Sequence, residues 1–225
     1  MSSIEFENQN DIVKEKLFSN DKDTFDTFKD LYFLTHNLCI YSHFLYKHMT
    51  YKDEINTYSQ FFIYESCMRH LTIGLGMLFT KKDRSEKATG CAFLSRIFDV
   101  VENIDNTGCQ IFSEPLRCFI SYKKSFDDQK RLVQTIYDEK IKIYRDKRYA
   151  HLDSDFHSQI TEINQVYVND IKSITDFCSL VKVMCIYIFR NKIEGKQKNQ
   201  IYDGSVFENQ QLLELYRIAG GKYYE

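Results

Sequence analysis

Apolar side chains recur at three- and four-residue steps along most of this chain, and very little interrupts them. One stripe consists of Phe25, Phe28, Leu31, Leu38, Leu45 and Met49. A second consists of Phe61, Tyr64, Met68, Leu71, Leu75 and Leu78. This spacing is the repeat of an α-helix with one buried face. Because the 225 residues include a single Pro and 8 Gly, few positions can break a helix. The pattern predicts an all-α fold.

The stripes predict four principal helices. They cover about residues 24–49, 54–80, a stretch from Ser125 into the segment around Arg145, and 159–190. Shorter helices are expected from about Leu94 to Asn106, after Ser113-Glu114-Pro115, and over 205–219. We expect one domain over 21–225, an up-down bundle, preceded by a flexible polar arm at 1–20. Gly74 and Gly76 interrupt the second helix and indicate the close approach of a neighbouring helix.

Composition restricts the class of partner and the cellular compartment. A formal net charge of -2 gives the whole chain no basic footprint, so any attraction to nucleic acid must be local. The seven cysteines include no C-x-x-C pair and read as buried thiols in a reducing compartment. Residues 1–7 lack a signal-peptide pattern, and the longest apolar stretch, 177–189, contains Lys182 and is too short to cross a bilayer. We therefore expect a cytoplasmic protein without a membrane span.

One segment, 145–151, combines residue types that suit phosphate chemistry. It reads Arg-Asp-Lys-Arg-Tyr-Ala-His, and it stands between two helical patterns. Arg145 supplies a permanent cation with a planar set of donors, and His151 can accept or donate a proton near neutral pH. The basic residues around it are Lys140, Lys142, Arg145, Lys147 and Arg148, with Glu139 just before them and Asp146 among them. The segment predicts a local site for phosphodiester cleavage.

The segment resembles the Arg-polar-(three to five residues)-His signature of the HEPN superfamily, the higher eukaryotes and prokaryotes nucleotide-binding domain. The string R-D-K-x-x-A-H followed by Leu152-Asp153 is similar to the AbiU-type abortive-infection branch. The order of long helices before and after the segment extends the resemblance over most of residues 20–190.

The resemblance implies a metal-independent endoribonuclease that needs no cofactor, acts as a toxin or in phage defence, and works as a homodimer on RNA. Arg145, Asp146 and His151 are then the catalytic residues, and Lys142, Lys147 and Arg148 bind RNA. Many HEPN toxins pair with a nucleotidyltransferase antitoxin that modifies a tyrosine two residues after the motif histidine. Asp153 stands at that position, so a neutralising antitoxin would be of another, unknown type.

Other interpretations remain open. Arg145 can be a surface cation at a helix C-terminus and His151 a polar loop residue, in a non-catalytic helical module that binds RNA or a protein. A divalent metal is conceivable at His151, Asp153, Asp155 and His157. A zinc site is conceivable between the first two helices at His36, Cys39, His43, Cys67 and His70. Both sets also have structural explanations, as helix caps and as packed core residues.

Overall fold

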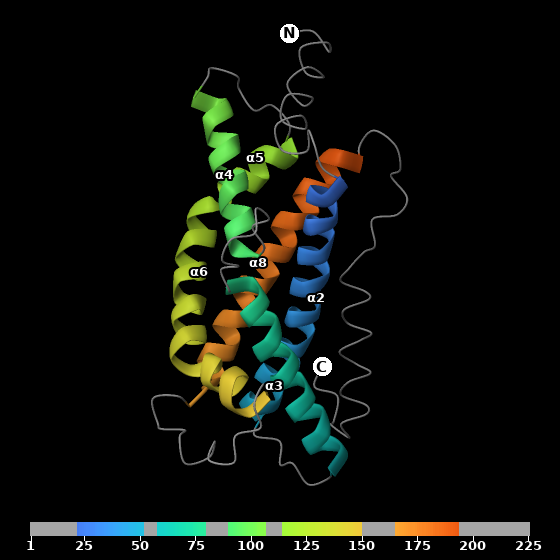
Figure 1. Cartoon of the computed structure of the whole chain (residues 1–225), viewed down its shortest axis with the longest axis vertical. Helices are drawn as coiled ribbons and strands as arrows, with labels where there is room; N and C mark the ends of the chain where they lie inside the picture. Colours follow the sequence, from blue (N-terminus) through green and yellow to red (C-terminus); the bar gives the residue numbers. More distant parts are fainter. Residues whose placement is uncertain (1–21, 52–57, 80–89, 107–113, 150–164, 194–225) are drawn as a thin grey trace.

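The computed structural model describes residues 22–51, 58–79, 90–106, 114–149 and 165–193 (Figure 1). Within these ranges the chain forms helices and no strands, which confirms the predicted all-α class. The expected arm at 1–20 and the expected helix at 205–219 lie outside the described residues. None of the described helices combines the length and the apolar character needed to cross a membrane.

The long helices fall close to the predicted stretches. They are α2 (Lys22–Tyr51), α3 (Tyr58–Phe79) and α8 (Val168–Ile193), with the shorter α4 (Cys91–Asn106) and α5 (Glu114–Ser121) between them. The helix that carries the basic segment starts as α6 (Lys123–Ile136) and continues as two π-helical turns, η1 (Tyr137–Ile141) and η2 (Tyr144–Tyr149). The predicted start after Ser113 is confirmed, because α5 begins at Glu114.

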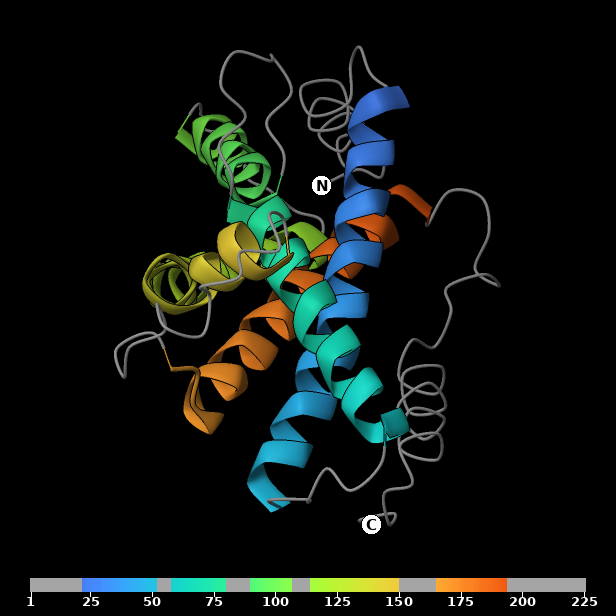
Figure 2. The ribbon, with the colours of Figure 1, turned by 60° about the horizontal axis from the view of Figure 1, so that its bottom comes forward.

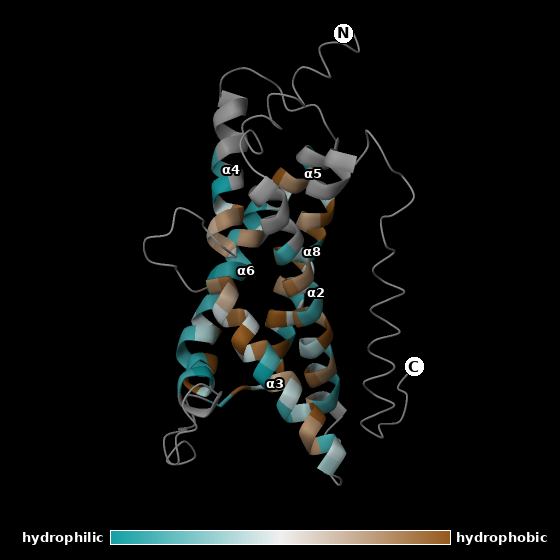
Figure 3. Cartoon of the chain, turned by 45° about the vertical axis from the view of Figure 1, so that its right-hand side comes forward, coloured by the Kyte–Doolittle hydropathy of each residue, from teal (hydrophilic) through white to brown (hydrophobic). Residues whose placement is uncertain are grey.

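Helix α8 lies at the centre of the packing and contacts α2, α5 and α6. Helix α3 packs on α2, α4, η1 and η2. The buried residues follow the sequence stripes, with Leu45, Leu71 and Phe177 fully enclosed. Figure 3 shows hydrophobic residues gathered where α2, α3 and α8 meet, and hydrophilic residues along the outer side of α6. Burying these side chains is the main driving force for this arrangement, because each contributes about 1.5–3 kcal/mol.

Aromatic rings form a connected row through this core. Phe98 stacks on Phe119 with ring centroids 4.7 Å apart and lies 5.6 Å from Phe126. Phe177 then links Phe126 to Phe79, at 5.9 Å on each side. The row ends at Tyr137, whose ring centroid lies 5.8 Å from that of Phe79. It therefore joins α5, α4, α6, α8 and α3 to the first π-helical turn.

Two glycines of α3 are positions of close approach, as the sequence predicted. A Cβ atom at Gly74 would lie 2.5 Å from Cδ2 of Leu38 on α2. A Cβ atom at Gly76 would lie 3.1 Å from the hydroxyl oxygen of Tyr137 and 3.3 Å from Cδ of Arg145. Gly90, just before α4, has a φ angle of 63°, and a Cβ there would overlap the backbone of Leu78.

The cysteines behave as the sequence predicted where the structure describes them. Cys39, Cys67, Cys91, Cys178 and Cys185 are buried thiols, and Cys118 is half-buried. Burial raises the pKa of the Cys67 thiol to about 12 and does the same for Cys91, where the nearby Lys130 acts in the opposite direction. Burial also raises the pKa of Cys178 and Cys185. These side chains pack as small apolar groups.

The predicted start of the last long helix at about 159 is wrong. Gln165–Tyr167 are not helical, and α8 begins at Val168. The Asp170 carboxylate accepts a hydrogen bond of 2.8 Å from the backbone N–H of Tyr167, as a residue in the first helical turn does when it caps a helix. Ile163 and Val166 continue the apolar spacing, so periodicity alone placed the start too early.

Candidate functional site

The helix that carries Arg145 is wider than an α-helix at two points. The backbone N–H of Lys142 bonds to the carbonyl oxygen of Tyr137, five residues earlier, which is the spacing of a π-helix. A second π-helical turn, η2, contains Arg145 and Asp146. Such turns are rare and occur frequently at functional sites. Here the first of them, η1, changes the direction in which Arg145 leaves the helix relative to Tyr137.

Arg145 is held from two sides. Its Nε donates a hydrogen bond of 2.6 Å to Oδ1 of Asp146, and its Nη2 forms an ion pair of 2.6 Å with the same oxygen. Its Nη1 donates a hydrogen bond of 2.5 Å to the hydroxyl oxygen of Tyr137. The guanidinium carbon also lies 5.8 Å from the centroid of the Tyr137 ring, within the range of a cation–π contact.

Helix α3 forms the floor under this group. Gly76 faces both Tyr137 and Arg145, and a Cβ atom there would lie 3.4 Å from Nη1 of Arg145. We call the helix formed by α6, η1 and η2 the motif helix. Figure 2 brings this end of the molecule forward and shows the yellow end of the motif helix lying over α3. Because glycine has no side chain, the arginine packs directly on the backbone of α3.

The guanidinium keeps capacity for another acceptor. Each terminal nitrogen of a guanidinium carries two N–H groups. Among the described residues, the contacts of Arg145 with Tyr137 and Asp146 use one N–H on Nη1 and one on Nη2. The Arg145 side chain is 29% exposed and that of Asp146 is 41% exposed, so water reaches the pair. The remaining N–H groups can therefore meet an anion at the surface.

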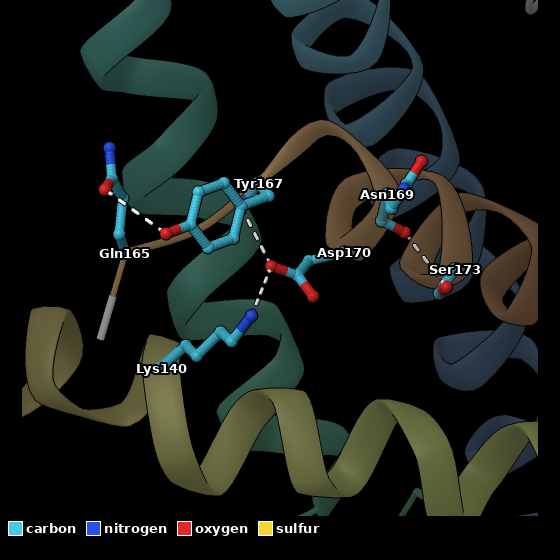
Figure 4. A network of polar contacts seen from close by, with 6 residues as sticks. All are labelled: Lys140, Gln165, Tyr167, Asn169, Asp170 and Ser173. Carbon is cyan, nitrogen blue, oxygen red and sulfur yellow. Dashed lines mark hydrogen bonds and ion pairs between the residues drawn. The ribbon is translucent and has the colours of Figure 1, made fainter. Parts of the chain in front are cut away.

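Lys140 has a structural partner. Its Nζ donates a hydrogen bond of 2.7 Å to Oδ2 of Asp170, and it lies 5.0 Å from the centroid of the Tyr167 ring (Figure 4). The two side chains of the ion pair are only 19% and 14% exposed. Asp170 thus joins the motif helix to the first turn of α8. Lys140 acts as a tie between helices, which separates it from the exposed cations of the segment.

The structure brings together some of the predicted site residues. Arg145 and Asp146 are in direct contact, so the carboxylate orients the guanidinium. Lys142 is exposed near them on the same helix. The side chains of Lys147 and Arg148, and all of His151, lie outside the described residues.

The structure describes only one of the two sets of residues that could bind a metal. The set that includes His151 lies outside the described residues. The other set is described, and no group of three or more metal-binding side chains occurs in the part of the chain that the structure describes. Cys39 Sγ instead lies 3.6 Å from the hydroxyl of Ser179, and His70 Nδ1 lies 2.7 Å from the carbonyl oxygen of Ser66. These residues pack in and around the helix interface.

Sequence reasoning missed Tyr137 as a site residue. Only 3% of the residue is exposed, so its ring belongs to the core. The available signal was its hydroxyl group, because a buried tyrosine usually finds a polar partner. That partner is Arg145, eight residues later on the same helix.

In comparisons with known proteins, no family model, curated protein or solved structure matches the chain.

Proposed function

We propose that the chain is a metal-independent endoribonuclease of the HEPN type, built on an up-down bundle whose principal helices are α2, α3, the motif helix and α8. The observation that carries the proposal is the state of Arg145. A permanent cation is oriented by Asp146 and Tyr137, stays partly exposed, and stands six residues before a histidine. One of the two anchors, the hydroxyl of Tyr137, belongs to a residue of the buried core.

The reaction follows from the groups that the segment contains. RNA carries its own nucleophile, the 2′-hydroxyl. His151 takes the proton of this hydroxyl, or donates one to the departing 5′-oxygen, and Arg145 neutralises the charge that builds on the non-bridging phosphate oxygens. The bond from phosphorus to the 5′-oxygen breaks as the bond to the 2′-oxygen forms. The products are a 2′,3′-cyclic phosphate and a 5′-hydroxyl, and DNA resists cleavage.

The remaining cations bind the RNA backbone. Lys142, Lys147 and Arg148 add positive charge on either side of Arg145, so they attract phosphates beside the one that is cleaved. Asp146 belongs to the catalytic set through its ion pair with Arg145.

A homodimer completes the site in this proposal. One chain offers one motif histidine, whereas in-line transfer handles protons on opposite sides of the phosphorus. A two-fold axis places a second copy of the same patch opposite the first. The cell would need to restrain such an enzyme, so a toxin or phage-defence role in the cytoplasm, with a neutralising antitoxin of unknown type, is part of the proposal.

The deciding experiment measures RNA cleavage by purified protein in excess chelator. We expect cleavage with 2′,3′-cyclic phosphate ends, and we expect His151→Ala to abolish it without changing the circular dichroism spectrum. Cleavage that disappears with chelator and returns with a divalent ion would reject the metal-independent mechanism. RNA binding without cleavage would instead identify the alternative, a non-catalytic RNA-binding module.

A further inference from the structure

The ring of Tyr137 is part of the hydrophobic core, and its hydroxyl oxygen is part of the candidate site. Its side chain is nearly inaccessible and closes the row of aromatic rings at Phe79. Its hydroxyl oxygen accepts the hydrogen bond from Nη1 of Arg145. Because the ring is fixed among buried neighbours, the oxygen has a fixed position as well. The acceptor therefore presents a rigid point to a side chain that is otherwise long and flexible.

Two anchors at different nitrogens determine the orientation of a planar group. Asp146 binds the guanidinium along Nε and Nη2, and Tyr137 binds it at Nη1. Asp146 is the more exposed of the two anchors, with 41% of its side chain accessible, so it can follow a movement of the arginine. Tyr137 cannot, because it is enclosed by the core. The tyrosine is thus the anchor that resists displacement.

The α3 backbone limits the remaining freedom. Gly76 lies against the Tyr137 hydroxyl and against Cδ and Nη1 of Arg145. The arginine side chain therefore cannot move closer to the core. The open directions lead to solvent, where the remaining N–H groups of the terminal nitrogens can meet an acceptor. The guanidinium of Arg145 is therefore packed against α3 on one side and hydrogen-bonded at two edges. These contacts leave it a narrow range of orientations.

We propose that Tyr137 is a positioning residue that sets the orientation of the Arg145 guanidinium before an anion arrives. The inference rests on the proposed function for its catalytic consequence, since it assumes that Arg145 meets the scissile phosphate. Tyr137 itself touches no RNA. It acts by removing the need to order the arginine during the reaction, which is the physical content of preorganisation.

The test is Tyr137→Phe, which removes the acceptor oxygen and keeps the ring in the core. We expect kcat for RNA cleavage to fall roughly 10- to 100-fold, with KM little changed. Tyr122→Phe is the matched control, because it removes the same hydroxyl from a half-buried tyrosine whose ring also packs on another ring, that of Tyr187 at 6.0 Å, away from Arg145. The control should leave kcat and KM at the wild-type values.

A second readout does not depend on RNA. The guanidinium N–H resonances of Arg145, assigned by their loss in Arg145→Lys, report rotation about the terminal C–N bonds. We expect slow rotation in the wild type and in Tyr122→Phe, and fast rotation in Tyr137→Phe. If Tyr137→Phe folds poorly, Gly76→Ala tests the same contact, because the added methyl group displaces the oxygen from Nη1 while the hydroxyl remains.

The outcomes separate the two proposals. If the wild type cleaves no RNA but Tyr137→Phe frees the guanidinium, the ribonuclease proposal fails and the positioning of Arg145 stands. If rotation at Arg145 is the same in the wild type, Tyr137→Phe and Gly76→Ala, the positioning role is wrong, whatever the variants do to cleavage.

Discussion

The hydroxyl of Tyr137 accepts a hydrogen bond from Arg145 across eight residues of a single helix. In a regular α-helix, residues eight apart point about 80° away from each other. The π-helical turn Tyr137–Ile141 takes up an extra residue between them and brings the two side chains closer to the same side. The pair therefore depends on a local widening of the helix.

Removing the guanidinium should have an effect different from removing a neighbouring cation. We expect Arg145→Ala to lower turnover by at least about 100-fold, because a donor to a developing oxyanion contributes about 3 kcal/mol. Lys142→Ala, on an exposed side chain, should mainly weaken RNA binding and reduce the slope of affinity against salt by about one. Single-turnover rates at saturating RNA distinguish the two. Unchanged turnover in Arg145→Ala, with weaker binding only, would make Arg145 a phosphate anchor.

The composite site predicts a homodimer that shares its catalytic groups. Light scattering at micromolar concentration should give twice the mass of one chain. A mixed dimer with one His151→Ala chain should lose far more than half of the wild-type rate, because each site needs both copies. A fully active monomer, or a mixed dimer at half rate, would show that each chain carries an independent site.

The two glycines of α3 should separate activity from stability. Gly76→Ala places a methyl group against Tyr137 and Arg145, so we expect slower RNA cleavage, about ten-fold. The free energy of unfolding of Gly76→Ala should change by less than about 1 kcal/mol. The reason is that alanine is more favourable than glycine in a helix by about 1 kcal/mol, which offsets the cost of the new contact. Gly74→Ala instead presses on the buried Leu38 and should lower that free energy by about 1 kcal/mol, with cleavage retained. Urea unfolding and kinetics measure both, and identical effects of the two variants would contradict the assignment.

The tie between Lys140 and Asp170 should contribute more to stability than an exposed pair. A double-mutant cycle of Lys140→Met and Asp170→Asn should give a coupling energy of about 1–2 kcal/mol, since both side chains are mostly buried. The control pair is Lys172 and Asp176, at 3.0 Å on the surface of α8 with 56% and 55% exposed side chains. Exposed pairs of this kind give about 0.3–0.5 kcal/mol. Equal couplings in the two cycles would remove the structural role of Lys140.

Stability should fall at alkaline pH because of the buried thiols. A thiol whose pKa is raised in the folded state stabilises the fold below its unfolded pKa, and this contribution is lost as pH rises from about 9 toward the folded value. For Cys67 that value is about 12. Each such thiol adds up to about 1.4 kcal/mol per pH unit to the slope of unfolding free energy against pH. Urea unfolding between about pH 8 and 10 should show a shallower slope of unfolding free energy against pH for Cys67→Ala than for the wild type. An unchanged slope would mean that folding does not raise the pKa of Cys67.

Periodicity in the sequence was sufficient to place the long helices, apart from the start of α8, because stripes such as Leu71, Leu75 and Leu78 become the buried faces. It also identified Gly74 and Gly76, where only the absence of a side chain permits the observed packing. It could not identify the pairing of Tyr137 with Arg145, because a fixed helical repeat does not include a π-helical turn. Nor could it pair Lys140 with Asp170, thirty residues away, since charge alone does not select one carboxylate among many.

The glycines of α3 also affect how movement passes through the molecule. A side chain between two helices can change its rotamer and so absorb a small shift of one helix. A glycine has no side chain that could do this. At Gly74 the α3 backbone rests on Leu38 of α2, and one half-turn later, at Gly76, it rests on the arginine. Close-packed interiors transmit strain. Helix α2 and the guanidinium of Arg145 are therefore coupled through the backbone of α3. We expect a displacement of α2 to shift Arg145, and a displacement of Arg145 to shift α2.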